Sequence, residues 1–186
     1  MIDKFTFRSR QEGYRARSVY KLLFLNRKYR IIKKGDKVLD LGCYPGSWLQ
    51  VIRQLKANAI GVDVKQISNI PDVKFILGDV REEKIIRKIK SLGKFDVVLS
   101  DLAPKTSGNK LLDQERSLEL SKVAFNIAKD VLKPKGNFVC KVFQSREFEE
   151  FLSKVKKEFY FVKATKPEAS KKESKEMYIV ALGYKG

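Results

Sequence analysis

A lysine lies in the middle of a stretch that is typical of a buried strand. Lys141 is the only charged residue in GNFVCKVF (136–143). Burying an ammonium group costs several kcal/mol unless a carboxylate accompanies it, so a partner must come from elsewhere in the chain. We expect Asp101, because it ends the apolar stretch KFDVVLSD (94–101), which we predict to be the neighbouring strand. Such a pair either takes part in proton transfer or serves only as a structural ion pair.

The residue types that are missing narrow the chemistry further. Histidine is absent from the 186 residues, and the chain has only two cysteines, Cys43 and Cys140. These facts exclude histidine bases, Ser–His or Cys–His nucleophile pairs, histidine metal sites and cysteine-rich zinc sites. We therefore expect no metal centre, and any base chemistry must use other side chains.

A glycine-rich turn and several acids follow the other predicted strands. The turn lies in LDLGCYPGSW (39–48), where glycines let the backbone approach a ligand closely. Asp63 comes 21 residues after Gly42, at the position from which a carboxylate binds ribose hydroxyls. Asp79 ends the next strand, within reach of an adenine amino group. The predicted ligand edge contains Asp40, Gly42, Pro45, Gly46, Asp63 and Asp79.

The spacing of the turn selects among nucleotide ligands. Its pattern, G-x-x-P-G, differs from the G-x-G-x-x-G fingerprint that binds a pyrophosphate. A dinucleotide is therefore disfavoured, and with it a nicotinamide oxidoreductase. An adenosine ligand without a pyrophosphate fits better, and this indicates S-adenosylmethionine.

Strand-like and helix-like stretches alternate along the chain. We predict strands at 37–41, 58–64, 73–79, 94–101, 136–143, 160–165 and 176–185, and helices at 17–31, 47–57, 81–92, 113–132 and 146–159. This alternation predicts an α/β fold with a parallel, doubly wound sheet, whose last two strands pair antiparallel because no helix joins them. Ligands of such sheets bind beyond the carboxyl ends of the strands, at the switch point that strands 37–41 and 94–101 flank.

The chain is long enough for one sizeable core and shows no repeat or linker. We therefore expect a single domain over residues 1–186, with a basic N-terminal arm and helix (1–37) and a Rossmann-like core (38–186). The first residues lack the apolar core of a signal peptide, and no apolar run approaches the roughly 20 residues that span a bilayer. We expect a cytoplasmic monomer without a membrane partner.

Five motifs occur in an order that is similar to a known family. LDLGCYPGSWLQ, ILGDVR, VVLSDLAPKTSG, FVCKVFQ and EMYIVALG resemble the RrmJ/FtsJ family of RNA ribose 2′-O-methyltransferases, from about Arg15 to the C-terminus. The resemblance implies a Rossmann-like methyltransferase fold with a mostly parallel seven-stranded sheet, helices on both faces and an antiparallel last strand. It implies S-adenosylmethionine on the Gly42–Gly46 loop and Trp48, with Asp63 at the ribose and Asp79 at the adenine. Ser47 departs from members that carry another glycine there.

The resemblance also implies a catalytic set. The residues that match it one by one are Lys21, Asp101, Lys141 and Glu176, and Asp101 also borders the cofactor. The methyl group on a sulfonium is already activated, so the difficult partner is a weakly acidic ribose hydroxyl. An amine in a buried or cationic environment can take its proton or stabilise the developing alkoxide. Without the family match, Lys21 would be interpreted as a solvated lysine and Glu176 as an ordinary residue at a strand end.

The charge of the chain, +18 in all, is concentrated in residues 1–37 and, to a lesser degree, in residues 154–175, which hold 8 Lys against 3 Asp or Glu. Residues 1–37 hold 12 Lys or Arg against 3 Asp or Glu, and aromatic residues alternate with the basic ones. This pattern favours a nucleic-acid-binding arm over a merely solubilising surface, and the resemblance implies that the nucleic acid is RNA. The arginines that we expect to contact RNA are Arg8, Arg10, Arg15 and Arg17.

Together these inferences predict an S-adenosylmethionine-dependent enzyme that methylates a ribose 2′-hydroxyl in RNA. A short chain without added domains most resembles family members that modify a uridine of 23S, or large-subunit, ribosomal RNA. Ribose methylation of transfer RNA is the alternative, since the same catalytic residues serve both. A non-catalytic RNA-binding module is a further alternative, against which the complete catalytic set argues.

Overall fold

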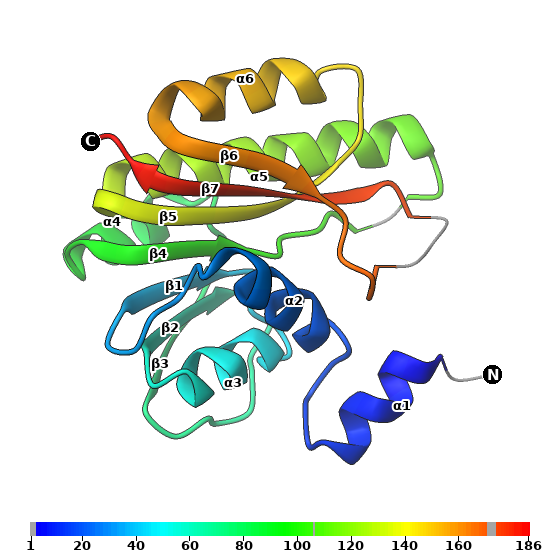
Figure 1. Ribbon diagram of the computed structural model, residues 1–186, viewed down its shortest axis with the longest axis vertical. Coiled ribbons are helices and arrows are strands. Elements are labelled where there is room, and N and C mark those ends of the chain that lie inside the picture. Colours follow the sequence, from blue (N-terminus) through cyan, green and yellow to red (C-terminus); the bar gives the residue numbers. More distant parts are fainter. Residues whose placement is uncertain (1–2, 106, 171–173) are drawn as a thin grey trace.

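The computed structural model describes residues 3–105, 107–170 and 174–186, and within them a seven-stranded sheet forms the centre (Figure 1). The strands are β1 (Lys37–Leu41), β2 (Asn58–Asp63), β3 (Val73–Leu77), β4 (Phe95–Ser100), β5 (Leu132–Phe143), β6 (Phe159–Thr165) and β7 (Glu176–Tyr184). Their order is β3-β2-β1-β4-β5-β7-β6, and β7 is antiparallel to both of its neighbours. The predicted mostly parallel sheet with an antiparallel last strand is confirmed.

Helices cover both faces of the sheet. They are α1 (Lys4–Gln11), α2 (Val19–Tyr29), α3 (Ser47–Gln54), α4 (Glu83–Ser91), α5 (Lys110–Val131) and α6 (Phe148–Glu158). One hydrophobic cluster joins α2 and α3 to the sheet, and a second joins α4, α5 and α6 to its other face, as the layers in Figure 1 show. No helix within the described residues is both long and apolar enough to cross a membrane.

The two central strands bring the predicted ligand edge together. β1 and β4 pair in parallel and are buried on both faces, which is why their sequences are nearly continuous apolar runs. Just beyond them, the backbone N–H of Asp101 donates to the carbonyl oxygen of Leu41. The ends of both strands are thereby held at one level, where the glycine-rich turn begins.

Several predicted boundaries differ from the structure, and three of the differences have a clear physical reason. The basic arm was not predicted to be helical before residue 17, but α1 forms there because the Asp3 carboxylate caps its first free N–H groups, those of Phe5 and Thr6. α2 ends earlier than predicted, since Arg30 adopts a left-handed conformation with φ of 52°. β5 begins at Leu132, before the predicted 136, because Leu132 pairs with Phe95 across an irregularity in the β4–β5 register.

Candidate active site

The pairing of strands explains how Lys141 meets a carboxylate. Ser100 of β4 lies opposite Cys140 of β5, and the next residues along these parallel strands are Asp101 and Lys141. On its other side, Lys141 lies opposite Tyr178 of the antiparallel strand β7. Residues directly opposite each other in a sheet project to the same face. The buried lysine therefore has polar neighbours on both sides.

The contacts around Asp101 are short. Lys141 is 7% exposed, and its Nζ lies 3.1 Å from Asp101 Oδ1 and donates to the Asp101 carbonyl oxygen at 2.7 Å. The hydroxyl of Tyr178 donates to the same Oδ1 at 2.6 Å. The expected Lys141–Asp101 pair is present, and its carboxylate is held by a second donor.

Tyr178 was not among the residues predicted from the sequence. Its side chain is fully buried, and burial, followed by the charges of Asp101 and Glu176, raises the pKa of its phenol far above the ordinary value. Tyr178 therefore keeps its proton and acts as a donor to Asp101. The signal in the sequence was its place two residues after Glu176, which puts both side chains on one face of the strand.

The second predicted lysine also has a carboxylate partner. Lys21, from α2, places its Nζ 2.7 Å from Glu176 Oε1, at the start of β7. Ser170 donates its hydroxyl to the same Oε1 at 2.8 Å. Both charged side chains are nearly buried, with 13% and 11% of their surfaces exposed. Ser170, unlike Tyr178, carried no sequence signal that distinguished it from other polar residues between β6 and β7.

Tyr178 connects the two ion pairs. The Nζ of Lys21 lies 5.7 Å from the centre of its ring, within range of a cation–π contact, while its hydroxyl binds the carboxylate that Lys141 contacts. The indole of Trp48 supports the same ring at 6.0 Å. The structure thus brings all four predicted catalytic residues around one buried tyrosine.

A cavity of about 830 Å³ adjoins this cluster at Asp101. Its walls come from the carboxyl ends of β1, β2, β3 and β4 and from one side of α5. The predicted cofactor residues that line it are Gly42, Asp63, Asp79 and Asp101. Arg116 and Glu119 of α5 also line the cavity. They were not predicted, because the sequence reasoning considered residues at the ends of strands and no local pattern shows that a helix side chain reaches the ligand edge.

The two half-buried acids at or just beyond the ends of β2 and β3 differ in how they are held. The carboxylate of Asp63 accepts the backbone N–H groups of Tyr44 and Lys65, each at 2.8 Å, so the backbone orients it at the end of β2. Asp79 forms a bidentate pair with Arg81, whose Nε donates to Oδ1 and whose Nη2 donates to Oδ2, and this pair lowers the pKa of the Asp79 carboxyl. Asp63 therefore has a fixed direction, whereas Asp79 shares its charge with a neighbouring cation.

Asp40 lies behind the cavity wall with its carboxyl completely buried. Neither of its carboxyl oxygens has a hydrogen-bond partner among the described residues. Burial, then the nearby charges of Asp101 and Asp63, raises the pKa of Asp40 well above its usual range. A buried acid without a partner is rare in native proteins and is typical of functional sites.

Only part of the glycine-rich turn lines the cavity. Gly42 has φ of 78°, and a side-chain carbon there would lie 2.9 Å from Leu102, so only glycine fits at this point of the cavity wall. Pro45, Gly46 and Trp48, by contrast, are not among the described residues that line the cavity. Trp48 is buried and donates its indole N–H to the carbonyl oxygen of Ser18, because α3 packs against α2.

The four arginines predicted to contact RNA separate into two pairs. Arg15 donates to the carbonyl oxygens of Pro45, Ser68 and Asn69, and Arg17 binds Asp3 and the carbonyl oxygen of Ala169. Those guanidinium groups are half-buried and bind other parts of the chain, and their expected contact with RNA stays a prediction. Arg8 forms an exposed pair with Glu12, and the exposed Arg10 side chain has no polar partner among the described residues.

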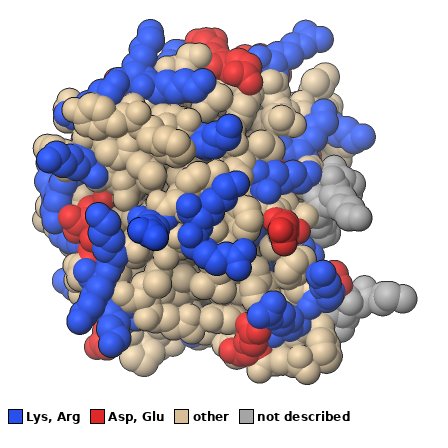
Figure 2. All heavy atoms as spheres, in the orientation of Figure 1, with Lys and Arg blue, Asp and Glu red and all other residues tan. Residues whose placement is uncertain are grey.

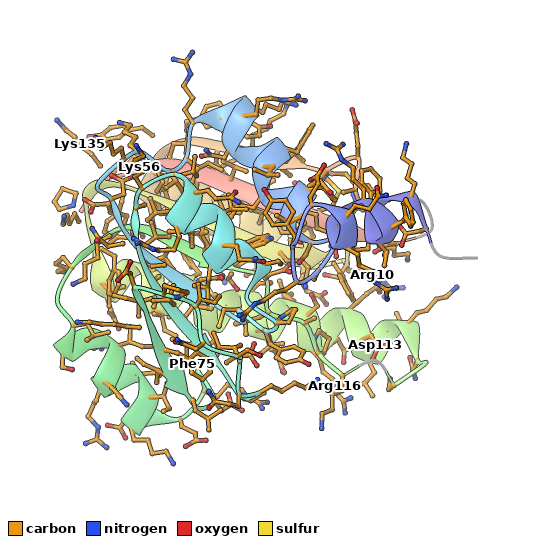
Figure 3. The ribbon with its side chains drawn as sticks, turned by 90° about the horizontal axis from the view of Figure 1, so that it is seen from below. Arg10, Lys56, Phe75, Asp113, Arg116 and Lys135 are labelled. Carbon is orange, nitrogen blue, oxygen red and sulfur yellow. The ribbon has the colours of Figure 1, made fainter. Side chains whose placement is uncertain are left out.

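Basic residues cover the molecule widely. Figure 2 shows Lys and Arg over much of one face, with Asp and Glu in a few separate patches. In Figure 3, Arg10 of α1 and Arg116 of α5 lie toward the edge where the parallel strands end, whereas Lys56 and Lys135 lie toward the opposite edge. Within the described residues, no group of three or more acidic or cysteine side chains could hold a metal ion.

Comparison with known proteins agrees with this geometry. The model of the FtsJ-like methyltransferase family matches residues 14–184. A "Ribosomal RNA large subunit methyltransferase E" of Archaeoglobus fulgidus is 42% identical over 98% of this chain and 96% of its own length. The protein of the same description from Acinetobacter baylyi is 44% identical over 98% of this chain and 88% of its own.

A solved structure gives the same result. A Plasmodium falciparum protein described as a ribosomal RNA methyltransferase has a TM-score of 0.83 and 33% identity, over 93% of this chain and all of its own. The fold, the near-complete match to the family model and the similarity to these relatives agree, and a family of methyltransferases implies a methyl donor of the S-adenosylmethionine type. This chain belongs to the FtsJ-like methyltransferase family.

Proposed function

We propose that this chain transfers a methyl group from S-adenosylmethionine to a ribose 2′-hydroxyl, and that its target is a uridine of large-subunit ribosomal RNA. The observation that carries the proposal is the pair of buried lysines, each on a carboxylate, at the end of the cavity that Asp101 shares. Relatives described as acting on large-subunit ribosomal RNA support the substrate class. All of the proposed catalytic residues come from one chain, which supports action as a monomer.

The residues of the cavity fit the proposed methyl donor. Gly42 allows the backbone to approach a ligand, and Asp63 presents an oriented carboxylate for ribose hydroxyls. Asp79 would reach an adenine amino group. Asp40, which has no partner among the described residues, would lose its proton and pair with the ammonium group of the donor once the donor is bound. Pro45, Gly46 and Trp48 would shape the cofactor loop from behind, since they do not line the cavity.

The donor, when bound, supplies a methyl group on a positively charged sulfur, which needs no further activation. The chain must then handle the proton of the hydroxyl. Lys141 is held in place by Asp101, and Tyr178 fixes that carboxylate from the other side. When the Lys141 amine is neutral, its Nζ takes the hydroxyl proton. When it is charged, it stabilises the developing alkoxide. Lys21 supplies a second cation to the same region.

RNA would approach along the edge where the strands end. Arg8 and Arg10 on the exposed face of α1 are the arginines that we retain for phosphate contacts. Arg116 and Lys105 on the cavity wall would meet the backbone near the target nucleotide.

The proposal is tested by transfer of a radioactive methyl group to three RNA preparations from a strain that lacks this protein. They are purified large-subunit ribosomal RNA, intact large subunits and total transfer RNA. We expect label in one of the ribosomal preparations and, after digestion, 2′-O-methyluridine by mass spectrometry. Lys141→Ala should abolish the label, and Lys154→Ala, a change on the exposed face of α6, should not.

Two results would contradict the proposal. Label in transfer RNA alone would assign the alternative substrate. RNA binding without label in any preparation, with the donor bound, would leave a non-catalytic RNA-binding module.

A further inference from the structure

The segment between α1 and α2 points one of its arginines toward the catalytic cluster. Arg17 has 22% of its side chain exposed, and its two terminal nitrogens make different contacts. Nη1 lies 2.8 Å from Asp3 Oδ2, and Nη2 donates to the carbonyl oxygen of Ala169 at 2.5 Å. Asp3 is also the residue that caps α1. Arg17 therefore ties the start of the basic helix to the segment that follows β6.

The contacted segment is a turn that presents Ser170. The backbone N–H of Ser170 donates to the carbonyl oxygen of Pro167, which closes the turn. Ser170 is 7% exposed, and its hydroxyl donates to Glu176 Oε1. Because Ala169 directly precedes Ser170, the contact from Arg17 holds the turn in the orientation that this hydrogen bond requires.

The bond from Ser170 ends on the oxygen that holds Lys21. Glu176 Oε1 accepts from Ser170 at 2.8 Å and lies 2.7 Å from Lys21 Nζ. A glutamate and a lysine on flexible stems lose entropy when they form one fixed pair. A buried hydroxyl that binds the carboxylate removes part of that freedom in advance. The chain Arg17, Ala169, Ser170, Glu176, Lys21 is therefore continuous from α1 to the reactive centre.

We infer that Arg17 and Ser170 are positioning residues for Lys21. Arg17 holds the 167–170 turn, the turn directs the Ser170 hydroxyl to Glu176, and Glu176 holds the Lys21 ammonium beside Tyr178. The inference rests on the proposed function, because it assigns Lys21 to the reacting hydroxyl. It also gives Arg17 a role different from the RNA contact expected from the sequence, and it makes the docking of α1 part of the catalytic arrangement.

Single-turnover methyl transfer, at saturating donor and RNA and over a range of pH, tests the inference. Ser170→Ala should lower the rate about tenfold and change the pH profile, because Glu176 then holds Lys21 less firmly. Ser170→Thr, which keeps the hydroxyl, should restore most of the rate. Donor affinity by calorimetry should be the same in all three proteins. A normal rate and pH profile in Ser170→Ala, or an equal loss of donor affinity, would overturn the inference.

Arg17→Gln has a matched comparison in Arg10→Gln, which removes the same charge from the exposed surface of α1. Arg17→Gln should lower the rate at saturating RNA by several-fold. Arg10→Gln should instead raise the RNA concentration that gives half of the maximal rate. If Arg17→Gln behaved as Arg10→Gln does, Arg17 would be an RNA contact and not a positioning residue.

A second measurement does not depend on RNA or activity, so it separates this inference from the proposed function. The rate at which an amine-reactive ester acylates Lys21 is measured by mass spectrometry, with the exposed Lys154 as an internal reference. Ser170→Ala and Arg17→Gln should each raise acylation of Lys21 several-fold and leave Lys154 unchanged. Unchanged acylation of Lys21 in both variants would overturn the inference, even if the wild-type protein methylated no RNA.

Discussion

Charged side chains on the two sides of the switch point between β1 and β4 have different partners. On the side of β4, β5 and β7, Lys21 and Lys141 each lie on a carboxylate that a tyrosine or serine hydroxyl also binds. On the side of β1 and β2, and within the part of the chain that the structure describes, Asp63 is held only by backbone N–H groups and Asp40 is buried without a partner.

The difference shows which interactions orient the side chains on each side of the switch point. The lysine side is organised by its own ion pairs, so it is prepared to act on a hydroxyl before any ligand arrives. The acidic side retains unused acceptors and negative charge, which a polar, cationic ligand would satisfy. Substitutions on the lysine side should therefore lower the rate of methyl transfer. Substitutions on the acidic side should change the affinity for the donor or the stability of the protein.

The largest expected effect comes from the lysine side. Lys141→Ala should lower single-turnover methyl transfer by about 10²–10⁴-fold, because it removes the group at the hydroxyl, while donor affinity stays near normal. Lys141→Arg distinguishes the two roles of Lys141, since a guanidinium keeps its charge and cannot act as a base. Near-normal turnover in Lys141→Arg would leave Lys141 as a fixed positive charge and nothing more.

On the acidic side, Asp63→Ala should weaken binding of S-adenosylmethionine by about 1–3 kcal/mol, the contribution of a hydrogen bond to a charged group. The rate at saturating donor should change little, which is the opposite pattern to Lys141→Ala. Calorimetry with the donor and with NAD measures both points, and NAD should bind weakly in each protein. Unaltered affinity for S-adenosylmethionine in Asp63→Ala would remove Asp63 from the ribose role.

Buried Asp40 on the acidic side should make the stability of the protein depend on pH. The raised pKa means that folded Asp40 holds its proton more tightly than it does in the unfolded chain. Its contribution to stability is fully present below the ordinary value of 3.8 and is lost as pH rises toward the folded-state pKa. Asn has no proton to lose, so Asp40→Asn should raise the free energy of unfolding by about 1–3 kcal/mol at neutral pH. The increase should be smaller at acidic pH.

Thermal unfolding at about pH 5 and about pH 8 measures this difference for Asp40→Asn. Asp72→Asn is the control, because Asp72 is 77% exposed and should show little dependence of its effect on pH. If the gain from Asp40→Asn were the same at both pH values, the carboxyl would be ionised and paired in solution.

The smallest effect concerns the RNA-binding surface. Replacing both Arg8 and Arg10 with Gln should weaken RNA binding and flatten its salt dependence, each lost phosphate contact reducing the slope by about 0.7–0.9. Lys56→Gln with Lys135→Gln removes the same charge from the opposite edge and should change the slope less (Figure 3). Equal slopes for the two double variants would show that the field of the whole protein, and not α1, attracts RNA.

Part of the site could be predicted from local rules, whereas Lys21 and Glu176 were assigned only through the family resemblance. Lys141 in an apolar strand required a partner, and the alternation of strands and helices placed Asp101 beside it. Tyr178 and Ser170 could not be found in the same way. A tyrosine in a strand and a serine in a turn are common, and only their direction toward Asp101 and Glu176 sets them apart.

The amino-acid sequence by itself determined the α/β fold, the antiparallel last strand, the switch point and the acids at the strand ends, since periodicity and turn residues act over short distances. Tertiary structure alone decided which basic residues remain free for a partner. Arg8, Arg10, Arg15 and Arg17 lie within ten residues of one another in the sequence, yet Arg15 and Arg17 reach carbonyl oxygens more than 25 positions away. A long guanidinium side chain binds whatever acceptors the folded chain brings near it, and no local pattern specifies them.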